Sequence, residues 1–193
     1  MSPSTKELIQ NAALRLFDER GVAATSIAQI RAEVGISNGS FFHAYKTRDD
    51  LCADIYLLAL KDYHAALVAN LPRTAQDGIA ALITAHLEWV VTSGPLARFL
   101  FEHARPEWLD SIRAEQAGEN AKLAEQLATW RAPLTKAGAL HPMSEMMFFA
   151  QLIGPAQVFC RAWLSGRNAE DPRTHARALI DNACRVLILT PDQ

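Results

Sequence analysis

A short run of small polar residues between positions 37 and 40 is the part of the sequence best suited to approach another molecule closely. Ser37-Asn38-Gly39-Ser40 is poor helix-forming material, yet hydrophobic residues flank it on both sides. Short side chains let a backbone come near a ligand, and an asparagine amide can form paired hydrogen bonds with the edge of adenine. His43, Lys46 and Arg48 follow closely and can contact phosphate groups. This combination is typical of a surface that binds nucleic acid.

The elements that must position these residues are three short helices. Ser4-Thr5-Lys6-Glu7 is a capping-box pattern that begins the first helix, and Gly21 is placed to end it. The next two helices are predicted over residues 26–34 and 38–44, with Gly35 allowing the positive φ of a sharp turn between them. Two helices joined in this way form a helix-turn-helix, whose second helix enters the major groove of DNA.

Residues 25–51, TSIAQIRAEVGISNGSFFHAYKTRDDL, resemble the signature of the TetR family of transcriptional regulators. Arg31 and Val34 stand where the family usually has alanine, and Phe42 replaces a tyrosine whose hydroxyl would reach a phosphate. The resemblance implies a dimeric regulator, usually a repressor, that binds a palindromic operator and is released by a small effector. The residues predicted to contact DNA are Thr25, Ser26, Arg31, Ser37, Asn38, Gly39, Ser40, Phe42, His43, Lys46 and Arg48.

The rest of the chain also predicts helices, and no stretch alternates in the manner of a strand. The expected fold is therefore all-α with about nine helices. A helix-turn-helix domain is predicted over residues 1–46, and a ligand-sensing and dimerisation domain over residues 47–193. The later helices are expected over residues 47–70, 75–92, 96–104, 106–130, 144–164 and 172–189, with Pro133 and Gly138 marking the end of the fourth of these.

The last two predicted helices are candidates for a dimer interface. Residues 146–164 are apolar almost all round, so that helix must be covered on more than one side. Residues 152–157 also resemble the eighth helix of some TetR members, and Gly154-Pro155 should kink the helix. The predicted interface residues are Phe159, Trp163, Ala176, Leu179, Ile180, Ala183, Cys184 and Leu187. The alternative is that both helices form only intramolecular core.

A pocket for an apolar or aromatic effector is expected among residues 50–165, because aromatic side chains there alternate with a few histidines and a glutamine. The candidates are His86, Trp89, Phe99, His103, Trp108, Trp130, Phe148, Gln151 and Phe159. Each of them is also a plausible ordinary core residue. A helical small-molecule-binding protein without DNA function is therefore the alternative reading of the whole chain.

Composition and spacing argue against other classes of protein. The formal net charge of −2 disfavours bulk coating of nucleic acid but permits site-specific binding. We find no catalytic constellation, metal-ligand spacing or phosphate-binding glycine loop, so we expect no enzyme, cofactor or metal. Cys52, Cys160 and Cys184 lie far apart and are expected to be buried thiols, with a redox role for Cys52 left open. Without a long apolar run or a signal-peptide pattern, we expect a cytoplasmic protein, nucleoid-associated when bound.

Overall fold

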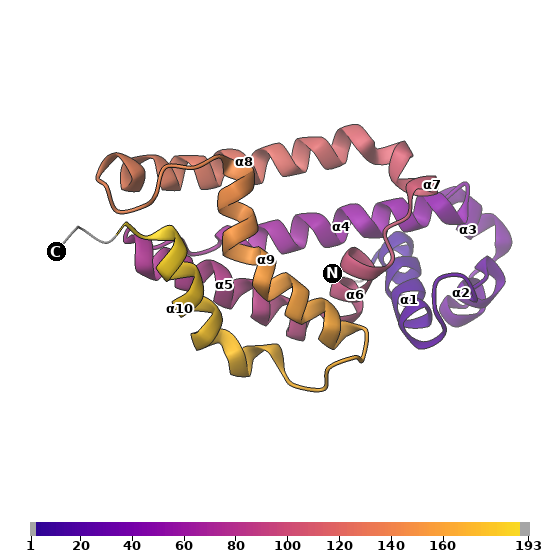
Figure 1. Cartoon of the computed structure of the whole chain (residues 1–193). Coiled ribbons are helices and arrows are strands. Elements are labelled where there is room, and N and C mark those ends of the chain that lie inside the picture. Colours follow the sequence, from indigo (N-terminus) through magenta and orange to yellow (C-terminus); the bar gives the residue numbers. More distant parts are fainter. Residues whose placement is uncertain (1–2, 190–193) are drawn as a thin grey trace. The chain divides into compact units, whose positions relative to one another are not determined.

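The computed structural model describes residues 3–189, and its helices follow one another along the chain as Figure 1 shows. Within this range the only β pairing is the isolated antiparallel bridge between Leu140 and Ile188, which confirms the all-α prediction. The α-helices are α1 Thr5–Arg20, α2 Ile27–Val34, α3 Asn38–Ala44, α4 Arg48–Val68, α5 Ala75–Thr92, α6 Gly94–Glu102, α7 Pro106–Leu109, α8 Arg113–Lys136, α9 Glu145–Leu164 and α10 Ala176–Leu187, with 3-10 turns η1 Asp110–Ile112 and η2 Pro172–His175.

The chain divides into two compact units. Unit 1 contains the residues up to Leu60 together with Pro95–Gln116, and unit 2 contains Lys61–Gly94 together with the residues from Ala117 onward. The helices α4 and α8 each contribute to both units. The predicted functional boundary after residue 46 stays a prediction, because this division follows packing alone.

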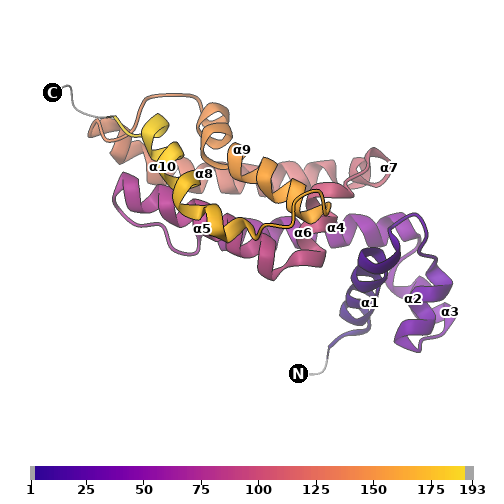
Figure 2. The same cartoon turned by 60° about the horizontal axis from the view of Figure 1, so that its bottom comes forward.

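In unit 1, the helices α1, α2 and α3 enclose a small hydrophobic core. Ile9, Phe17, Ile30 and Phe41 are buried there, and α1 packs against both α2 and α3. Figure 2 shows the three helices grouped around α1. Each helix is begun by a serine whose hydroxyl accepts a hydrogen bond from a backbone N–H in the first turn. The predicted helix starts at Ser4, Ser26 and Ser37 are therefore confirmed.

Aromatic rings extend the core of unit 1 to α6 and α7. The rings of Phe17 and Phe99 stack with centroids 5.6 Å apart, and those of Phe99 and Trp108 stack at 5.7 Å. Tyr56 on α4 meets Trp108 edge to face. Phe99 and Trp108 are thus central packing residues of the unit that also holds the predicted helix-turn-helix.

In unit 2, α5, α9 and α10 pack against one another, and both views show them side by side (Figures 1 and 2). Gly78 on α5 lies against Trp130: a Cβ built on it would be 2.1 Å from Cζ2 of the indole. The indole Nε1 of Trp130 donates a hydrogen bond to the carbonyl of Pro72 at 2.7 Å. The glycine therefore permits a close contact that holds α8 on the segment preceding α5.

Two prolines lie inside helices. The predicted end of the helix near Trp130 was too early, because α8 continues through Pro133 to Lys136. Pro133 lies in the last turns, where its missing N–H removes a single hydrogen bond from an exposed part of the helix. Pro155 lies within α9, which Figure 1 shows bending part-way along. No single helix among residues 3–189 is long and apolar enough to cross a membrane; α5 and α6 reach that length and composition only when taken together.

Candidate nucleic-acid interface

The turn between α2 and α3 has the geometry that the sequence predicts. Gly35 ends α2 with φ 74°, in the left-handed region, and its N–H donates to the carbonyl of Arg31. Ser37 then begins α3, and its Oγ accepts a hydrogen bond from the N–H of Ser40 at 3.1 Å. The side chains of Ser26 and Gln29 complete a capping box at the start of α2. Both helices are thus fixed locally, before any contact with a partner.

The helix α3 has one buried and one exposed side. Phe41 is fully buried, and the remaining residues expose polar groups, small groups and the Phe42 ring, which is 44% exposed. A shallow recess of about 370 Å³ lies on this surface, lined by Thr5, Gly39, Ser40, His43 and Ala44. The exposed residues that the structure brings together here are Asn38, Gly39, Ser40, Phe42, His43 and Lys46.

One hydrogen bond links the two helices across the turn. Nη1 of Arg31 on α2 donates to Oδ1 of Asn38 at 2.8 Å. The paired hydrogen bonds to adenine expected from the sequence require that same oxygen as an acceptor, so an adenine amino group would have to share it with the Arg31 guanidinium. Arg31, which replaces a small residue in the family pattern, is therefore positioned directly beside the residue predicted to contact a base.

Two of the residues predicted to contact DNA instead stabilise the three-helix group α1, α2 and α3 from within. Thr25 is only 1% exposed, and its hydroxyl donates to the carbonyls of Leu16 and Gly21. Nη1 of Arg48 donates to the carbonyls of Val22 and Thr25, each at 3.1 Å. These contacts fix the loop between α1 and α2. We therefore leave Thr25 and Arg48 out of the contact set that we propose below.

A hydrogen-bonded cluster around Asp54 joins α1, the end of α3 and α4. Asp54 Oδ2 accepts from Gln10 at 2.8 Å and from the Tyr45 hydroxyl at 2.7 Å, and lies 2.9 Å from the ammonium of Lys6. Burial raises the pKa of Asp54, but hydrogen bonds from Lys6, Tyr45 and Gln10 outweigh it, so the pKa lies below its usual value. Sequence reasoning missed this cluster, although the polar Gln10 within an apolar helix face was a signal for it.

Comparison with known proteins finds a family match in the N-terminal part of the chain. Residues 9–55 match the model of "Bacterial regulatory proteins, tetR family", which covers α1, α2, α3 and the start of α4. This N-terminal part of the chain is therefore similar to the TetR family. One curated relative, the HTH-type transcriptional regulator YerO of Bacillus subtilis, is 33% identical over 75 residues, which are 39% of this chain and 24% of that protein. The chain thus matches about a quarter of that relative's length.

Solved TetR structures share the fold over nearly the whole chain. A tetR-family regulatory protein from Rhodococcus RHA1 superposes with a TM-score of 0.77 at 22% identity, covering 98% of this chain and 100% of that one. The regulator FadR from Bacillus subtilis, solved in complex with stearoyl-CoA, gives a TM-score of 0.75 at 13% identity, covering 92% and 96% of the two chains. At these identities the likeness concerns the fold.

The residues predicted to line an effector pocket do not all belong to one unit of the chain. Phe99, His103 and Trp108 are part of unit 1, where Phe99 and Trp108 are buried packing residues. The candidates within unit 2 are His86, Trp89, Trp130, Phe148, Gln151 and Phe159. His86, Trp89 and Phe148 are buried. Trp130, Gln151 and Phe159 are partly exposed.

Polar partners accompany two of the unit 2 candidates. The Tyr63 hydroxyl is hydrogen-bonded to Nδ1 of His86 at 2.8 Å, and Nε1 of Trp89 donates to Asp62 at 2.7 Å. Burial lowers the pKa of His86 to about 4, so its ring is neutral at pH 7. Sequence reasoning missed Tyr63 and Asp62, because only the tertiary structure shows that α4 and α5 align these pairs.

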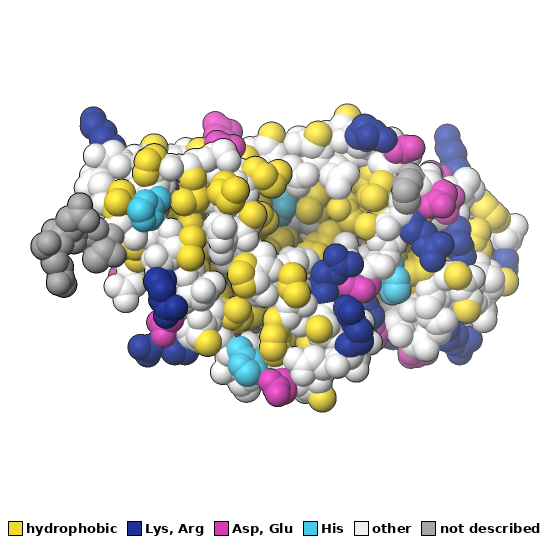
Figure 3. Space-filling view, in the orientation of Figure 1, with side chains coloured by type: hydrophobic (Ala, Val, Ile, Leu, Met, Phe, Trp, Pro, Cys, Tyr) yellow, Lys and Arg dark blue, Asp and Glu magenta, His cyan; other side chains and the backbone are white. Residues whose placement is uncertain are grey.

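The predicted dimer residues fall into two groups. Ala183 and Leu187 are buried within unit 2 itself, so their side chains do not reach the surface of the single chain. The side chains of Phe159, Trp163, Ala176, Leu179, Ile180 and Cys184 are only partly buried in the single chain. Val158 on α9, which the prediction omitted, is 71% exposed. Figure 3 shows hydrophobic side chains gathered over α9.

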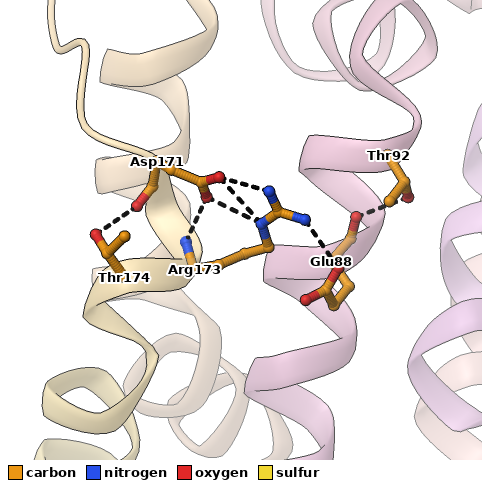
Figure 4. Close-up of polar contacts among 5 residues, drawn as sticks. All are labelled: Glu88, Thr92, Asp171, Arg173 and Thr174. Carbon is orange, nitrogen blue, oxygen red and sulfur yellow. Dashed lines mark hydrogen bonds and ion pairs between the residues drawn. The ribbon is translucent and has the colours of Figure 1, made fainter.

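A polar contact network holds the segment before α10 in place, as Figure 4 shows. Arg173 on η2 pairs with Asp171 through Nη2 and Oδ2 at 2.6 Å and reaches Oε2 of Glu88 on α5 at 3.5 Å. The Thr174 hydroxyl donates to the Asp171 carbonyl, and that of Thr92 donates to the Glu88 carbonyl. The start of α10 is thereby attached to α5 by side chains as well as by packing.

Cys52 and Cys160 are buried, and Cys184 is partly buried. Burial raises the pKa of Cys52 to about 11 and that of Cys160 to about 12, so both thiols stay protonated at neutral pH and are poor nucleophiles. Within residues 3–189, no group of three or more His, Cys, Asp or Glu side chains is arranged to hold a metal ion.

Proposed function

We propose that this protein is a ligand-responsive transcriptional repressor that binds a palindromic operator as a homodimer in the cytoplasm and leaves it when a small apolar effector binds. The observation that carries the proposal is the exposed face of α3 beside the Gly35 turn. The buried Phe41 anchors α3, so the exposed side chains of this helix can contact a partner without rearrangement of the core.

The proposed DNA-contacting set combines direct and electrostatic contacts. Asn38, Ser40 and Phe42 lie on α3, the helix that would enter the major groove, while His43 and Lys46 would meet the flanking phosphates. Ser26, Arg31, Ser37 and Gly39 complete the set. The low net charge of the chain means that affinity depends on this placement rather than on a general positive surface.

The dimer proposal rests on the apolar residues that α9 and α10 leave partly uncovered. A largely exposed Val158 lies next to Phe159 on α9, and Leu179 and Ile180 lie on α10. Helices with this character in two copies can pair around a twofold axis, each copy covering the same patch of the other. A helix-turn-helix dimer would then present its reading helices to half-sites about 34–36 Å apart.

The effector proposal rests on the chemistry of unit 2. Trp89, Phe148 and the neutral His86–Tyr63 pair offer apolar rings with a few oriented polar groups, which suits a ligand without net charge at its buried end. The similarity to FadR, solved with stearoyl-CoA, supports a ligand with an apolar portion. Such a ligand would act by binding the DNA-free state of the dimer more tightly than the DNA-bound state.

The proposal can be tested by selecting random duplex DNA on the full-length protein and titrating the enriched sequence at two salt concentrations. We expect a palindromic consensus. Lys46→Ala should weaken binding to all sequences and reduce the slope of log affinity against log salt by about one, since one phosphate contact is lost. The matched control is Lys122→Ala, which removes another exposed lysine from α8. Absence of any enriched sequence, even at low salt, would leave a helical small-molecule-binding protein as the better description.

Assembly and release can be measured with the same material. Val158→Glu should shift the sedimentation coefficient from dimer to monomer, whereas Ala121→Glu on the exposed surface of α8 should not. Stearoyl-CoA is the first effector probe, with coenzyme A alone as the control for its polar portion. Release of DNA by the acylated compound only would support an apolar effector, and equal release by both would contradict it.

A further inference from the structure

The hydrogen bond between Arg31 and Asn38 determines which way the asparagine amide faces. Arginine has only donors, so the atom that it contacts at 2.8 Å must be the carbonyl oxygen Oδ1. The amide nitrogen Nδ2 is then on the opposite branch of an exposed side chain, and it forms no hydrogen bond within the described part of the chain. Asn38 consequently offers the donors of Nδ2, while Oδ1 is shared with Arg31.

The guanidinium of Arg31 adds further donors at the same place. Arg31 is partly buried, and its Nε is enclosed without a hydrogen-bond partner among residues 3–189. The aliphatic part of the side chain is therefore held against the three-helix group α1, α2 and α3, while Nη1 reaches Asn38. The remaining N–H groups of Arg31 and Asn38 therefore give this surface more donors than acceptors, and its side-chain acceptor Oδ1 is already bonded to a cation. We call these two side chains the donor pair.

Base edges in the major groove differ in how they match such a surface. Guanine presents two adjacent acceptors, N7 and O6, whereas adenine presents the acceptor N7 beside the donor N6. Cytosine presents a donor, and thymine presents one acceptor beside a methyl group. From this, and resting on the proposed function, we infer that the donor pair specifies guanine at one position of each operator half-site. An unpaired asparagine at this place would favour adenine.

The first test uses the unmodified protein. Its enriched half-site should contain an invariant guanine, and replacing that G·C pair with A·T should weaken binding on the order of 10- to 100-fold. Replacing the same guanine with 7-deazaguanine, which lacks only the N7 acceptor, should weaken binding by a smaller factor. Neither measurement depends on whether a variant of Arg31 folds.

The second test repeats the selection with Arg31→Ala. With Oδ1 of Asn38 released, the preference at this position should change from guanine to adenine, while the other positions of the consensus stay the same. The matched control is Arg15→Ala. Arg15 lies in the same three-helix group α1, α2 and α3, but it pairs with Glu33 and not with Asn38. The control should keep guanine.

The outcomes separate this inference from the proposed function. A palindromic consensus without an invariant guanine, or one whose guanine persists in Arg31→Ala, overturns the donor pair while leaving the regulator intact. Uniform loss of affinity across sequences in Arg31→Ala, with a salt slope lower by about one, would show a phosphate contact and also overturn it. If the unmodified protein enriches no sequence, both proposals fail.

Discussion

The Tyr45 hydroxyl donates a 2.7 Å hydrogen bond to the Asp54 carboxylate, which connects the residue that ends α3 to the second turn of α4. Tyr45 is buried, and Lys6 lies over its ring with Nζ 5.4 Å from the centroid. The contact therefore joins the end of the proposed reading helix to two other elements, and it gives the carboxylate one of its three side-chain donors.

Tyr45→Phe should lower the free energy of unfolding by about 2 kcal/mol, because a hydrogen bond to an ionised acceptor is lost while the ring still fills the core. Urea unfolding followed by circular dichroism measures this change. Phe42→Tyr, which adds a hydroxyl to an exposed ring, is the control and should change stability by less than about 0.5 kcal/mol. An unchanged denaturation midpoint in Tyr45→Phe would show that the Asp54 contact contributes nothing to stability.

Phe42→Tyr has a second use as a test of DNA contact. The variant restores the hydroxyl that the TetR pattern usually places at this exposed position, so it should gain one phosphate hydrogen bond. We expect affinity for the selected operator to rise about fivefold, corresponding to about 1 kcal/mol. Fluorescence anisotropy with labelled operator measures the effect. Unaltered affinity would mean that position 42 does not face the backbone of the bound DNA.

Gly78→Ala should destabilise the protein by about 1–3 kcal/mol, because the Cβ of the alanine would lie 2.1 Å from Cζ2 of Trp130. The matched control is Gly118→Ala on α8, where nothing lies within 4 Å of the added Cβ. That change should stabilise the helix by about 0.5–1 kcal/mol, since alanine has the higher helix propensity. Thermal unfolding of both variants provides the comparison, and equal effects would contradict the close contact of Gly78 with Trp130.

Stability should depend on the protonation of His86. Its folded pKa of about 4 lies below the unfolded value near 6.5, so between these values the unfolded chain binds more protons and stability falls as pH decreases. At pH 5 the loss relative to pH 7 should be about 2 kcal/mol for this residue. Urea titrations at both pH values measure it.

His86→Gln provides the comparison, because glutamine does not titrate. The loss of stability between pH 7 and pH 5 should be smaller in this variant by about 2 kcal/mol, whatever the other histidines contribute. An identical loss in the two proteins would mean that His86 protonates as readily in the folded state as in the unfolded chain.

Local sequence was sufficient to predict much of the helical framework. Ser4, Ser26, Ser37 and Ser144 begin helices as predicted, because a cap depends on a hydroxyl and a backbone N–H only three residues away. Gly35 has the predicted left-handed backbone for the same local reason. The end of α8 was predicted less well, since a proline near a helix terminus costs little once packing holds the helix.

Contacts between residues distant in sequence were decided by the tertiary structure alone. Asp54 receives donors from α1 and from the end of α3, and the preference of Asn38 depends on Arg31 across a turn. Leu187 satisfied the helical periodicity of an interface but is buried within its own chain. Periodicity shows that a residue faces something apolar, whereas only the folded arrangement of helices decides which surface covers it. The sequence alone determined the family pattern and the helix boundaries set by caps; packing determined which polar side chains remain available for function.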